Sequence, residues 1–441
     1  MTSRFWFAAY NLLFLPLFLG IVKLLAFSKT NLRESLEKRE GQWERLADGV
    51  SKRDWQKPLV WLHVASAGEY LQAQPVIERC VAEGAECVLT YSSINAYRWL
   101  ERPQHAKISG LLISEFLPPD TLWNARRLLG LLQPSRLVWV SYDLWPNLVW
   151  EAHQQKIPQS LISAIVHADS PRTANIAGRS FYHSIYECLE HILTVSEGDR
   201  QRILSAIPEH PKVEVMGDTR CDSVLERRDR LKIPELPQAA KDGFVFVAGS
   251  TWPPDEACIF PALKDALIEF PELFLILAPH EPAEEYLKKA ETHFAGIPLL
   301  RWSNISSAPE GVRILLIDSV GILAGLYHSA KMAYVGGAFT TGVHNILEPA
   351  AMGAIVAFGP KHDNSIEALQ MLEQKLVNTV KNSAEFRKLL FDLLADQAYC
   401  FDLGKKSQAF VFDLGKKSQA FVEAQAGAAE LCVPLLMKDL S

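Results

Sequence analysis

The chain contains two series of short apolar runs, and this pattern constrains its fold more than any other feature of the sequence. Each run is rich in Val, Leu, Ile and Phe and is followed by a longer segment with helical spacing. Short, continuously apolar runs are typical of strands buried on both faces of a parallel sheet that helices cover. The runs are residues 59–64, 87–91, 137–140, 159–165 and 191–195 in the first series, and 244–248, 273–278, 314–317, 332–335 and 354–358 in the second.

A charged stretch at residues 222–242, which contains Pro234 and Pro237, separates the two series. Such a stretch between periodic segments indicates a linker, and 441 residues fit two domains better than one core. We therefore predict an α/β fold of two Rossmann-like domains, at residues 29–225 and 240–425, facing each other across a central cleft. Residues 426–441 are expected to form a C-terminal tail.

The N-terminal segment is long and apolar enough to act as a membrane anchor. Residues 5–22 carry no charge and the apolar character continues through 24–27, while about 20 such residues suffice to cross a bilayer as a helix. Basic residues follow the run whereas only Arg4 precedes it, which favours an anchor at residues 1–28 with the remaining chain in the cytoplasm. An interfacial helix and a cleaved signal peptide are the alternatives.

Composition excludes several classes of protein. A net charge of −6 and a pI near 6.1 provide no basic field for coating nucleic acid. The seven cysteines are scattered, without the paired spacing of a disulfide framework or a zinc site. There is no P-loop and no G-x-G-x-x-G motif, and no acidic cluster has metal-binding spacing.

Glu69 is the first candidate catalytic residue. It follows the run at 59–64 on the turn Ser66-x-Gly68-Glu69, at the start of an expected helix. A carboxylate there is well placed to act as a general base at the carboxyl end of a strand. The alternative is a capping box, in which Ser66 caps the helix and Glu69 lies three residues on.

Asp143 is the second candidate. It belongs to the segment Asp-Leu-Trp-Pro-Asn at 143–147, directly after the run at 137–140. A second acid at the same sheet edge could orient an acceptor or support the base. The alternative is an acidic turn residue beside a proline that begins a helix.

The second series presents features that suit a nucleotide. Glycines at 336–337 allow backbone to approach a ligand closely, and a helix expected near Asn345 offers N–H groups to a phosphate. Glu348, one turn later, could accept hydrogen bonds from ribose hydroxyls. Segments 249–251 and 279–280 follow neighbouring runs and could surround the same ligand, although each taken alone is compatible with an ordinary turn or cap.

One segment repeats without change: FDLGKKSQAFV occupies residues 401–411 and again 412–422. Eleven residues are close to three helical turns, so the duplication preserves the buried face of a helix. We assign no chemistry to this repeat.

With these motifs the chain resembles the 3-deoxy-D-manno-octulosonic acid (Kdo) transferases of lipopolysaccharide synthesis, from the N-terminal segment to about residue 395. The matching motifs are Ser-x-Gly-Glu at 66–69, acid-x-Trp-Pro-Asn at 143–147, Gly-Ser-Thr at 249–251, and Val-Gly-Gly through His-Asn-x-x-Glu-Pro at 335–349.

The resemblance implies a GT-B glycosyltransferase that uses CMP-Kdo as donor and a lipid A precursor (lipid IVA) as acceptor, inverting the anomeric carbon without a metal or other cofactor. It implies a location at the inner (cytoplasmic) membrane, with an acceptor-binding N-terminal domain and a CMP-binding C-terminal domain facing the cytoplasm. By position, Glu69 is the catalytic base and Asp143 stands where the family usually has Glu. The implied donor contacts are Ser250, Pro279, His280, Gly321, Ile322, Leu323, Asn345, Ile346, Leu347 and Glu348.

Three departures from the family pattern affect the donor contacts. The usual Pro-Arg-His is Pro279-His280, and the usual Gly-Glu-Leu is Gly-Ile-Leu at 321–323. The usual Asn-x-Arg is Ser-Ala-Ile at 163–165, with His167 or Arg172 as substitutes. Two other functions stay open: a GT-B enzyme with another donor or a soluble acceptor, and a membrane-associated binder without activity.

Overall fold

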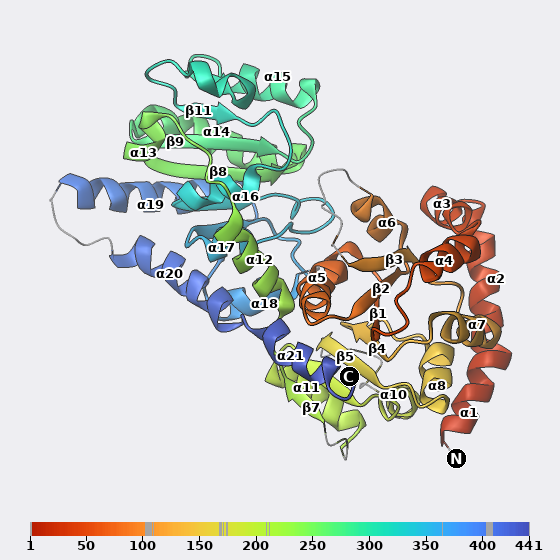
Figure 1. The fold of residues 1–441 in the computed structure, drawn as a ribbon. Helices are drawn as coiled ribbons and strands as arrows, with labels where there is room; N and C mark the ends of the chain where they lie inside the picture. The colour runs from red at the N-terminus through yellow and green to blue at the C-terminus, as the bar shows by residue number, and fades with distance from the viewer. Residues whose placement is uncertain are drawn as a thin grey trace. The chain divides into compact units, whose positions relative to one another are not determined.

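The computed structural model describes residues 2–101, 108, 110–166, 170, 172, 175–208, 210, 212–363, 365–402 and 409–440. It forms two compact units (Figure 1). Unit 1 comprises Met1–Ser223 together with Gln425–Ser441, and unit 2 comprises Val224–Ala424. The division falls inside helix α12 (Thr219–Arg230), within the charged stretch between the two series.

Unit 1 is built on a parallel sheet with the strand order β3-β2-β1-β4-β5-β6-β7 in the described part of the chain. Its central strands β1, β4 and β5 are buried along their whole length, as expected for a sheet covered on both faces. The strands are β1 (Leu59–Val64), β2 (Glu86–Tyr91), β3 (Leu111–Phe116), β4 (Arg136–Val140), β5 (Gln159–Ala164), β6 (His191–Thr194) and β7 (Val213–Val215).

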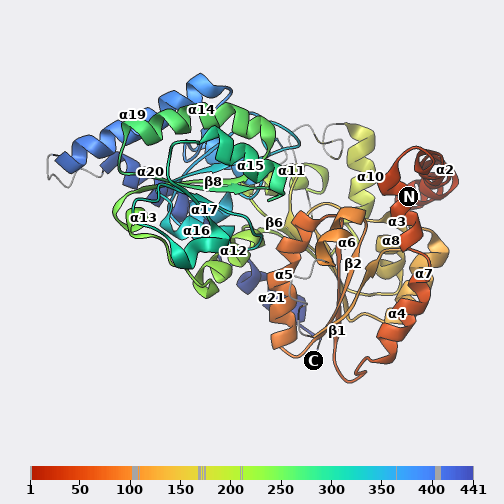
Figure 2. The ribbon, with the colours of Figure 1, turned by 90° about the horizontal axis from the view of Figure 1, so that it is seen from above.

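Helices cover both faces of this sheet, as Figures 1 and 2 show. One face packs on α4, α7, α8 and α10, and the other on α5, α6 and α21. The helices of unit 1 are α1 (Thr2–Ala9), the π-helix η1 (Tyr10–Phe14), α2 (Leu15–Ala26), α3 (Thr30–Lys38), α4 (Gln42–Ser51), α5 (Ala67–Ala82), α6 (Ile94–Leu100), α7 (Leu122–Leu132), α8 (Pro146–Gln154), α10 (Ile176–Tyr186), α11 (Glu197–Ala206) and α21 (Ala428–Met437).

Unit 2 repeats this architecture with the strand order β10-β11-β9-β8-β12-β13-β14 among its described residues. Its strands are β8 (Phe244–Thr251), β9 (Leu273–Pro279), β10 (Leu299–Arg301), β11 (Ile314–Leu316), β12 (Met332–Val335), β13 (Ile355–Phe358) and β14 (Asn378–Thr379). Its helices are α13 (Gln238–Asp242), α14 (Pro253–Glu269), α15 (Glu284–His293), η2 (Trp302–Ser307), α16 (Leu323–Leu326), η3 (Tyr327–Ser329), α17 (Leu347–Ala351), α18 (Ile366–Glu373), α19 (Ser383–Asp402) and α20 (Ala409–Ala424). The predicted α/β class with two parallel-sheet domains is therefore confirmed.

Every run that the sequence analysis assigned to a strand contains one, but some strands carry no such signal. Strand β3 is the clearest case, because Ser114 and Glu115 interrupt its apolar pattern. Glu115 is nevertheless buried, and its carboxylate pairs with the Arg45 guanidinium from α4. A buried charge is tolerated when it is paired in this way. The contact with Arg45 therefore explains how β3 can be buried without an apolar residue at position 115.

The segment after residue 425, which was expected to be a tail, forms helix α21 and packs on α5 of unit 1. Asp222 caps its start, because its carboxylate accepts hydrogen bonds from the N–H groups of Gly427 and Ala429 at 2.6 and 3.0 Å. Several of its apolar side chains, among them Val433 and Leu436, are fully buried. The second copy of the 11-residue repeat lies in α20, whereas residues 403–408 of the first copy lie outside the described residues.

Two described segments, Arg4–Ala26 and Asp413–Met437, are long and apolar enough to cross a membrane by length and composition alone. The second includes α21 and contributes to the core of unit 1. Only 6% of the first is buried, although Trp6, Phe7 and Tyr10 pack against the core of unit 1.

Candidate active site

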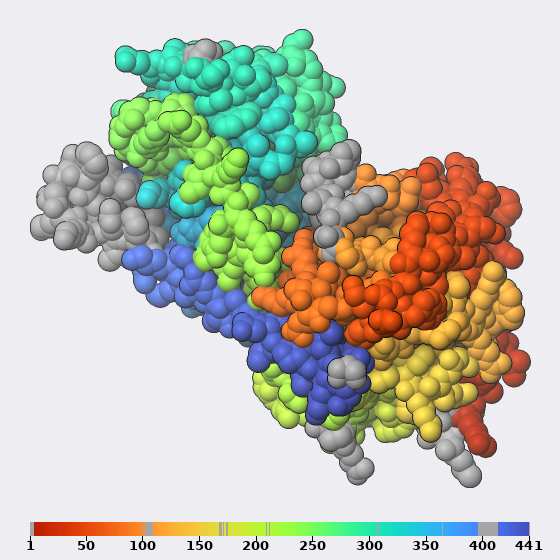
Figure 3. Space-filling model, in the orientation of Figure 1, coloured from red at the N-terminus to blue at the C-terminus, as the bar shows by residue number. Residues whose placement is uncertain are grey.

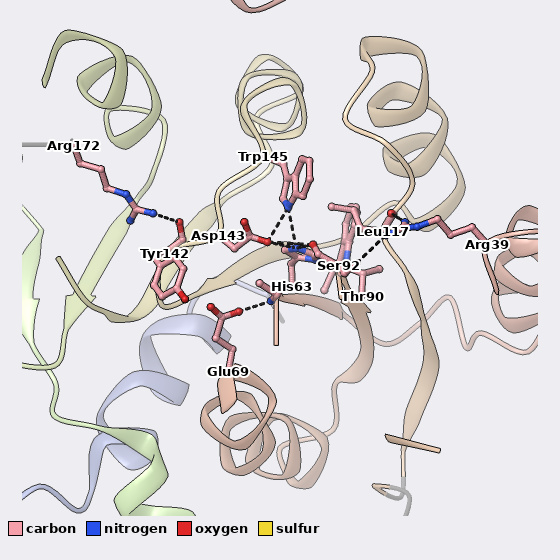
Figure 4. Close-up of polar contacts among 12 residues, drawn as sticks. Arg39, His63, Glu69, Thr90, Ser92, Leu117, Tyr142, Asp143, Trp145 and Arg172 are labelled. Carbon is pink, nitrogen blue, oxygen red and sulfur yellow. Dashed lines mark hydrogen bonds and ion pairs between the residues drawn. The ribbon is translucent and has the colours of Figure 1, made fainter. Parts of the chain in front are cut away.

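In unit 1 the predicted residues gather at one edge of the sheet (Figure 4). Strands β2, β1 and β4 are adjacent and parallel, so their carboxyl ends meet at this edge. Glu69 lies in the first turn of α5 after β1, Asp143 follows β4, and Ser92 follows β2. The sheet order thus brings together two acids that are distant in the sequence.

Glu69 both caps a helix and presents a buried carboxyl oxygen. The Ser66 hydroxyl caps α5 by accepting from the N–H of Glu69 at 3.3 Å, and Oε2 of Glu69 accepts from the N–H of Ala65. The capping alternative therefore describes part of the geometry. However, Oε1 of Glu69 is buried with no hydrogen-bond partner in the described structure, and the carboxyl group points toward the Tyr142 ring (Figure 4).

The environment of Glu69 favours the protonated form. Burial raises the pKa of Glu69 to about 8, an effect that the N–H of Ala65 opposes and the nearby charge of Asp143 reinforces. A carboxyl with a pKa close to the working pH can both accept a proton and release it. Its single unpartnered oxygen is the atom free to do so.

Three polar groups contact one carboxylate oxygen of Asp143. Oδ2 accepts from the Ser92 hydroxyl at 3.1 Å and from the Trp145 indole N–H at 3.1 Å, and it lies 3.3 Å from Nε2 of His63. Burial acts to raise its pKa, but the hydrogen bonds from His63, Trp145 and Ser92 outweigh burial and leave the pKa below its usual range. Asp143 is therefore an ionised acid beside a protonated one, which separates their chemical roles.

His63 is completely buried at the centre of this network. Its Nδ1 lies 2.9 Å from the Thr90 hydroxyl, which also accepts from the Trp61 indole N–H at 2.9 Å. The ring is thus fixed on both sides, and through it the sheet interior fixes the carboxylate of Asp143.

Arg172 supplies a positive charge near Glu69. Its guanidinium donates to the carbonyl oxygen of Tyr142 at 2.8 Å and lies over the rings of Tyr142 and Tyr182. It also acts to lower the pKa of Glu69. Of the two substitutes expected for the family's arginine, Arg172 therefore lies near Glu69, and His167 lies outside the described residues.

In unit 2 the predicted donor contacts also follow neighbouring strands. Ser250 lies near the end of β8 with a positive φ of 53°, and Pro279 ends the adjacent strand β9. The N–H of His280 donates to the carbonyl oxygen of Thr251 at 2.9 Å, which joins the two strand ends. These three predicted residues are thus brought together.

A stack of three rings lies at this edge. The His280 ring stacks on Trp252 at 4.4 Å and on His344 at 4.5 Å between ring centroids. The Trp252 indole N–H donates to Nε2 of His344 at 3.1 Å, which requires that this nitrogen carry no proton. Burial, reinforced by His280, lowers the pKa of His344 to about 4, in agreement with a neutral ring.

The remaining predicted contacts divide into two groups. At 345–348, the Asn345 side chain accepts from the N–H of Leu347 at 3.0 Å, while the side chains of Ile346 and Leu347 are buried in packing. Glu348 pairs with Arg227 of α12 at 2.8 Å. Its pKa is raised by burial, which the Arg227 contact opposes.

The second group is residues 321–323, which lie after β11, a neighbour of β9 rather than of β8. Gly321 has a positive φ of 92°, and Ile322 precedes the short helix α16. A side-chain carbon of Leu323 approaches the position that a Cβ on Gly249 would occupy to 3.2 Å. Residues 321–323 therefore approach the end of β8, although β11 itself is not adjacent to β8.

Sequence reasoning did not identify Ser92, Trp145, Trp252 or His344 as site residues. Trp145 and His344 belong to motifs that the sequence analysis recognised, so those motifs already indicated that both residues lie near the site. Ser92 follows the apolar run at 87–91 directly, and Trp252 follows the Gly-Ser-Thr segment at 249–251; these positions were the available signal for them.

Comparison with solved structures identifies the fold class. The chain matches a UDP-N-acetylglucosamine 2-epimerase from Listeria monocytogenes with a TM-score of 0.56 at 12% identity, over 86% of this chain and 96% of that one. It matches MurG from Acinetobacter baumannii with a TM-score of 0.52 at 12% identity, over 86% and 99% of the two chains. At these identities the likeness concerns the fold alone.

Comparison of sequences shows which enzymes the chain is similar to. Residues 35–223 match the family model described as 3-deoxy-D-manno-octulosonic-acid transferase (kdotransferase). A 3-deoxy-D-manno-octulosonic acid transferase from Bordetella pertussis is 28% identical over 74% of this chain and 78% of that protein. One from Haemophilus influenzae is 25% identical over 84% and 85%. The chain is thus a glycosyltransferase of the GT-B type. Its resemblance to the Kdo transferase family, which the motifs predicted, is confirmed.

Proposed function

We propose that the chain transfers Kdo from CMP-Kdo to a lipid A precursor such as lipid IVA, with inversion at the anomeric carbon and without a metal. The observation that carries this proposal is the buried Glu69 carboxyl, which has one unpartnered oxygen and lies beside the ionised Asp143. Both acids lie within the residues that match the Kdo transferase family model.

In this proposal Glu69 accepts the proton of the acceptor hydroxyl as that oxygen attacks the sugar. Asp143, fixed by His63 and Trp145, keeps its charge throughout and raises the basicity of Glu69. Arg172 is available to bind an acidic group of a substrate near the base. Acid and base roles are commonly divided between two carboxyl groups whose environments push their pKa values apart.

The donor would lie on unit 2, at the ends of β8, β9 and β12. Backbone N–H groups and the ring stack of Trp252, His280 and His344 would contact the CMP portion. Glu348 would accept from the ribose, as the family resemblance implies. Fixed dipoles around the phosphate stabilise the charge that develops on the departing nucleotide.

The apolar N-terminal helix would place the enzyme at the inner membrane with both units on the cytoplasmic side. A lipid acceptor is confined to the membrane, so an enzyme held there meets it at high local concentration. The basic residues after the helix agree with this orientation.

Incubation of the full chain with CMP-Kdo and lipid IVA, followed by mass spectrometry, tests the proposal. We expect products carrying one or more Kdo residues, with the same yield when EDTA is present. A parallel incubation with UDP-N-acetylglucosamine should give neither transfer nor epimerisation. Turnover of the UDP-sugar with no Kdo product would contradict the proposed donor.

The pH dependence of transfer should report the titration of Glu69. A base must be deprotonated to act, so kcat/KM should rise about tenfold per pH unit below about pH 8 and level off above it. Asp143 raises the pKa of Glu69, so Asp143→Asn should move the midpoint to lower pH. A rate that is flat between about pH 6 and 9 would rule out Glu69 as the titrating base.

A further inference from the structure

Three polar side chains lie buried together on one face of the unit 1 sheet. Trp61 and His63 are two residues apart on β1 and therefore share a face, and Thr90 is the partner of His63 in the register of β2. All three are completely buried, on the face that α4, α7, α8 and α10 cover. Helix α4 forms part of the outer surface of unit 1 in Figure 3. Buried in this way, Trp61 and Thr90 can act on a substrate only through other residues.

The hydrogen bonds among these three side chains run in one direction. The indole N–H of Trp61 can only donate, and it donates to Oγ1 of Thr90 at 2.9 Å. The proton of the Thr90 hydroxyl then has one acceptor in the described structure, Nδ1 of His63 at 2.9 Å. A ring nitrogen that accepts a hydrogen bond carries no proton, and a neutral imidazole carries one proton. The proton of His63 is therefore on Nε2.

Nε2 is the ring nitrogen that faces the acids of the site. It lies 3.1 Å from the Ser92 hydroxyl oxygen and 3.3 Å from Oδ2 of Asp143. The Trp145 indole N–H lies 3.1 Å from both Nε2 and Oδ2, and when Nε2 carries a proton this N–H can donate only to the carboxylate. Asp143 is then surrounded at Oδ2 by donors, which favours its ionised form.

The other tautomer would reverse this effect. With its proton on Nδ1, His63 would direct a lone pair of Nε2 at the lone pairs of Oδ2, 3.3 Å away. Two facing acceptors repel each other unless a proton lies between them, so Asp143 would have to take up a proton or move away. The hydroxyl of Thr90 thus decides which charge state of Asp143 the site favours.

Asp143 lies within electrostatic reach of titratable groups on several elements. These groups are Glu69 on α5, Asp120 before α7, Tyr142 after β4 and Tyr10 in the N-terminal segment. The charge of Asp143 raises the pKa of Glu69, whereas Arg172 acts to lower it. A change in the charge of Asp143 therefore changes the pH at which Glu69 can act as a base.

We propose that Thr90 and Trp61 are positioning residues for the transfer reaction: they keep the proton of His63 on Nε2, and the protonated Nε2 keeps Asp143 ionised beside Glu69. This inference rests on the roles that the proposed function gives to the two acids. It extends the site to two core residues that touch neither acid.

The tautomer of His63 provides the first test, because it can be measured by NMR without turnover. In the full chain with isotopically labelled histidine, the ring nitrogens of His63 are assigned by comparison with His63→Gln. Their chemical shifts distinguish a protonated nitrogen from an unprotonated one. We expect Nδ1 to be unprotonated and Nε2 to be protonated. A wild-type ring that is protonated on Nδ1, or on both nitrogens, would overturn the proposal.

Thr90→Val provides the second test, because valine has nearly the shape of threonine and also favours a strand. It removes the donor to Nδ1, so both tautomers of His63 should become populated. We expect kcat/KM for Kdo transfer to fall about tenfold at about pH 9, a modest part of the 10²–10⁴ that a general base contributes. The midpoint of the pH profile should move to lower pH, because Asp143 no longer keeps its full charge. The loss should therefore be smaller at about pH 6.

Two matched variants separate this effect from a loss of packing. Thr90→Ser keeps the hydroxyl and should restore both the tautomer and the midpoint. Thr194→Val makes the same change at a completely buried position on β6 of the same sheet, where the hydroxyl donates to backbone carbonyl oxygens instead. It should lower the melting temperature, as Thr90→Val does, and leave the midpoint of the pH profile unchanged.

Trp61→Phe tests the same inference if Thr90→Val does not fold. Without the indole N–H, the Thr90 hydroxyl can either donate to Nδ1 or accept from it, so we expect a mixture of tautomers and a smaller shift of the midpoint in the same direction. A His63 ring that stays entirely in the Nε2-protonated form in both variants would contradict the proposal. So would an altered tautomer with an unchanged midpoint.

The failure of this inference can be distinguished from the failure of the proposed function. A chain that shows the expected tautomers but transfers no Kdo would contradict the proposed function alone. A chain that transfers Kdo with the proton of His63 on Nδ1 would contradict this inference alone.

Discussion

Replacing Glu69 with glutamine is expected to reduce the rate of Kdo transfer by about 10³-fold, since general base catalysis typically contributes factors of 10²–10⁴. Glutamine has the shape of glutamate, and its side-chain oxygen can still accept from the N–H of Ala65. It cannot accept a proton at the position of Oε1. The loss should therefore appear in kcat, while the affinity for CMP, measured by calorimetry, should change less than about twofold.

The fold of this variant should be preserved. The pKa of Glu69 is raised to about 8, well above that of an unfolded glutamate, so the folded state binds more protons than the unfolded state between those two pKa values. Stability is then lost as the pH rises through that range. A neutral glutamine avoids this loss, and the variant should melt no lower than the wild type at about pH 9.

Glu78→Gln is the matched control, because it makes the same chemical change on the same helix, where Glu78 accepts only from Gln74 in the described structure. It should retain full activity. Asp143→Asn should give an intermediate loss, because Ser92 and Trp145 can still donate to the amide oxygen while the charge is removed. Full activity of Glu69→Gln would show that another group is the base.

Replacing Gly336 with alanine is expected to destroy donor binding and to destabilise unit 2. A Cβ on Gly336 would lie 2.2 Å from the carbonyl oxygen of Ser250 and 2.7 Å from Cα of Thr251. Both neighbours are backbone atoms of β8 and cannot rotate away, so the strand ends must separate. Forced overpacking typically costs 1–3 kcal/mol, and we expect about 3 kcal/mol here.

The separation would act directly on the donor site. Gly336 donates to Gly249 at 2.9 Å and accepts from the N–H of His344 at 3.1 Å, so its displacement moves both β8 and the ring stack. We expect CMP affinity to fall at least about tenfold, measured by calorimetry at a temperature where the variant is folded. The folded fraction is checked by circular dichroism.

Gly130→Ala is the control for this substitution. Gly130 lies inside α7 of unit 1 with no atom within 4 Å of the added Cβ, so alanine should stabilise the helix by up to about 1 kcal/mol and leave CMP binding unchanged. Undiminished CMP affinity in Gly336→Ala would mean that the end of β12 does not contact the donor.

Local sequence pattern was sufficient for the central strands of both cores and for the places where the two acids lie. Strands β1, β4 and β8 are buried on both faces, and that environment favours a largely apolar run. Because ligands of such sheets gather at the carboxyl ends of strands, Glu69 and Asp143 could be selected by position. The same reasoning could not find β3, whose buried Glu115 depends on Arg45 from another helix.

The partners of the site residues were decided by the tertiary structure. His63 contacts Asp143 because β1 and β4 are adjacent in the sheet. The order of strands in a sheet is not encoded in any local sequence pattern. The ring stack of Trp252, His280 and His344 likewise depends on β8 lying between β9 and β12. The raised pKa of Glu69 arises from burial by the surrounding residues rather than from its own turn.

The N-terminal segment shows the same difference between what the local sequence predicts and what tertiary contacts decide. Hydropathy alone predicted a membrane-associated helix at residues 5–22, because an uncharged run of that length has few other uses in water. Whether Tyr10 and Asn11 face lipid or protein was settled by Asp120 and Asn147, more than 100 residues away. Side-chain chemistry and spacing determine which segments are buried. Long-range packing determines which partners each segment contacts, because the contact energies depend on pairs of residues that only the folded chain brings together.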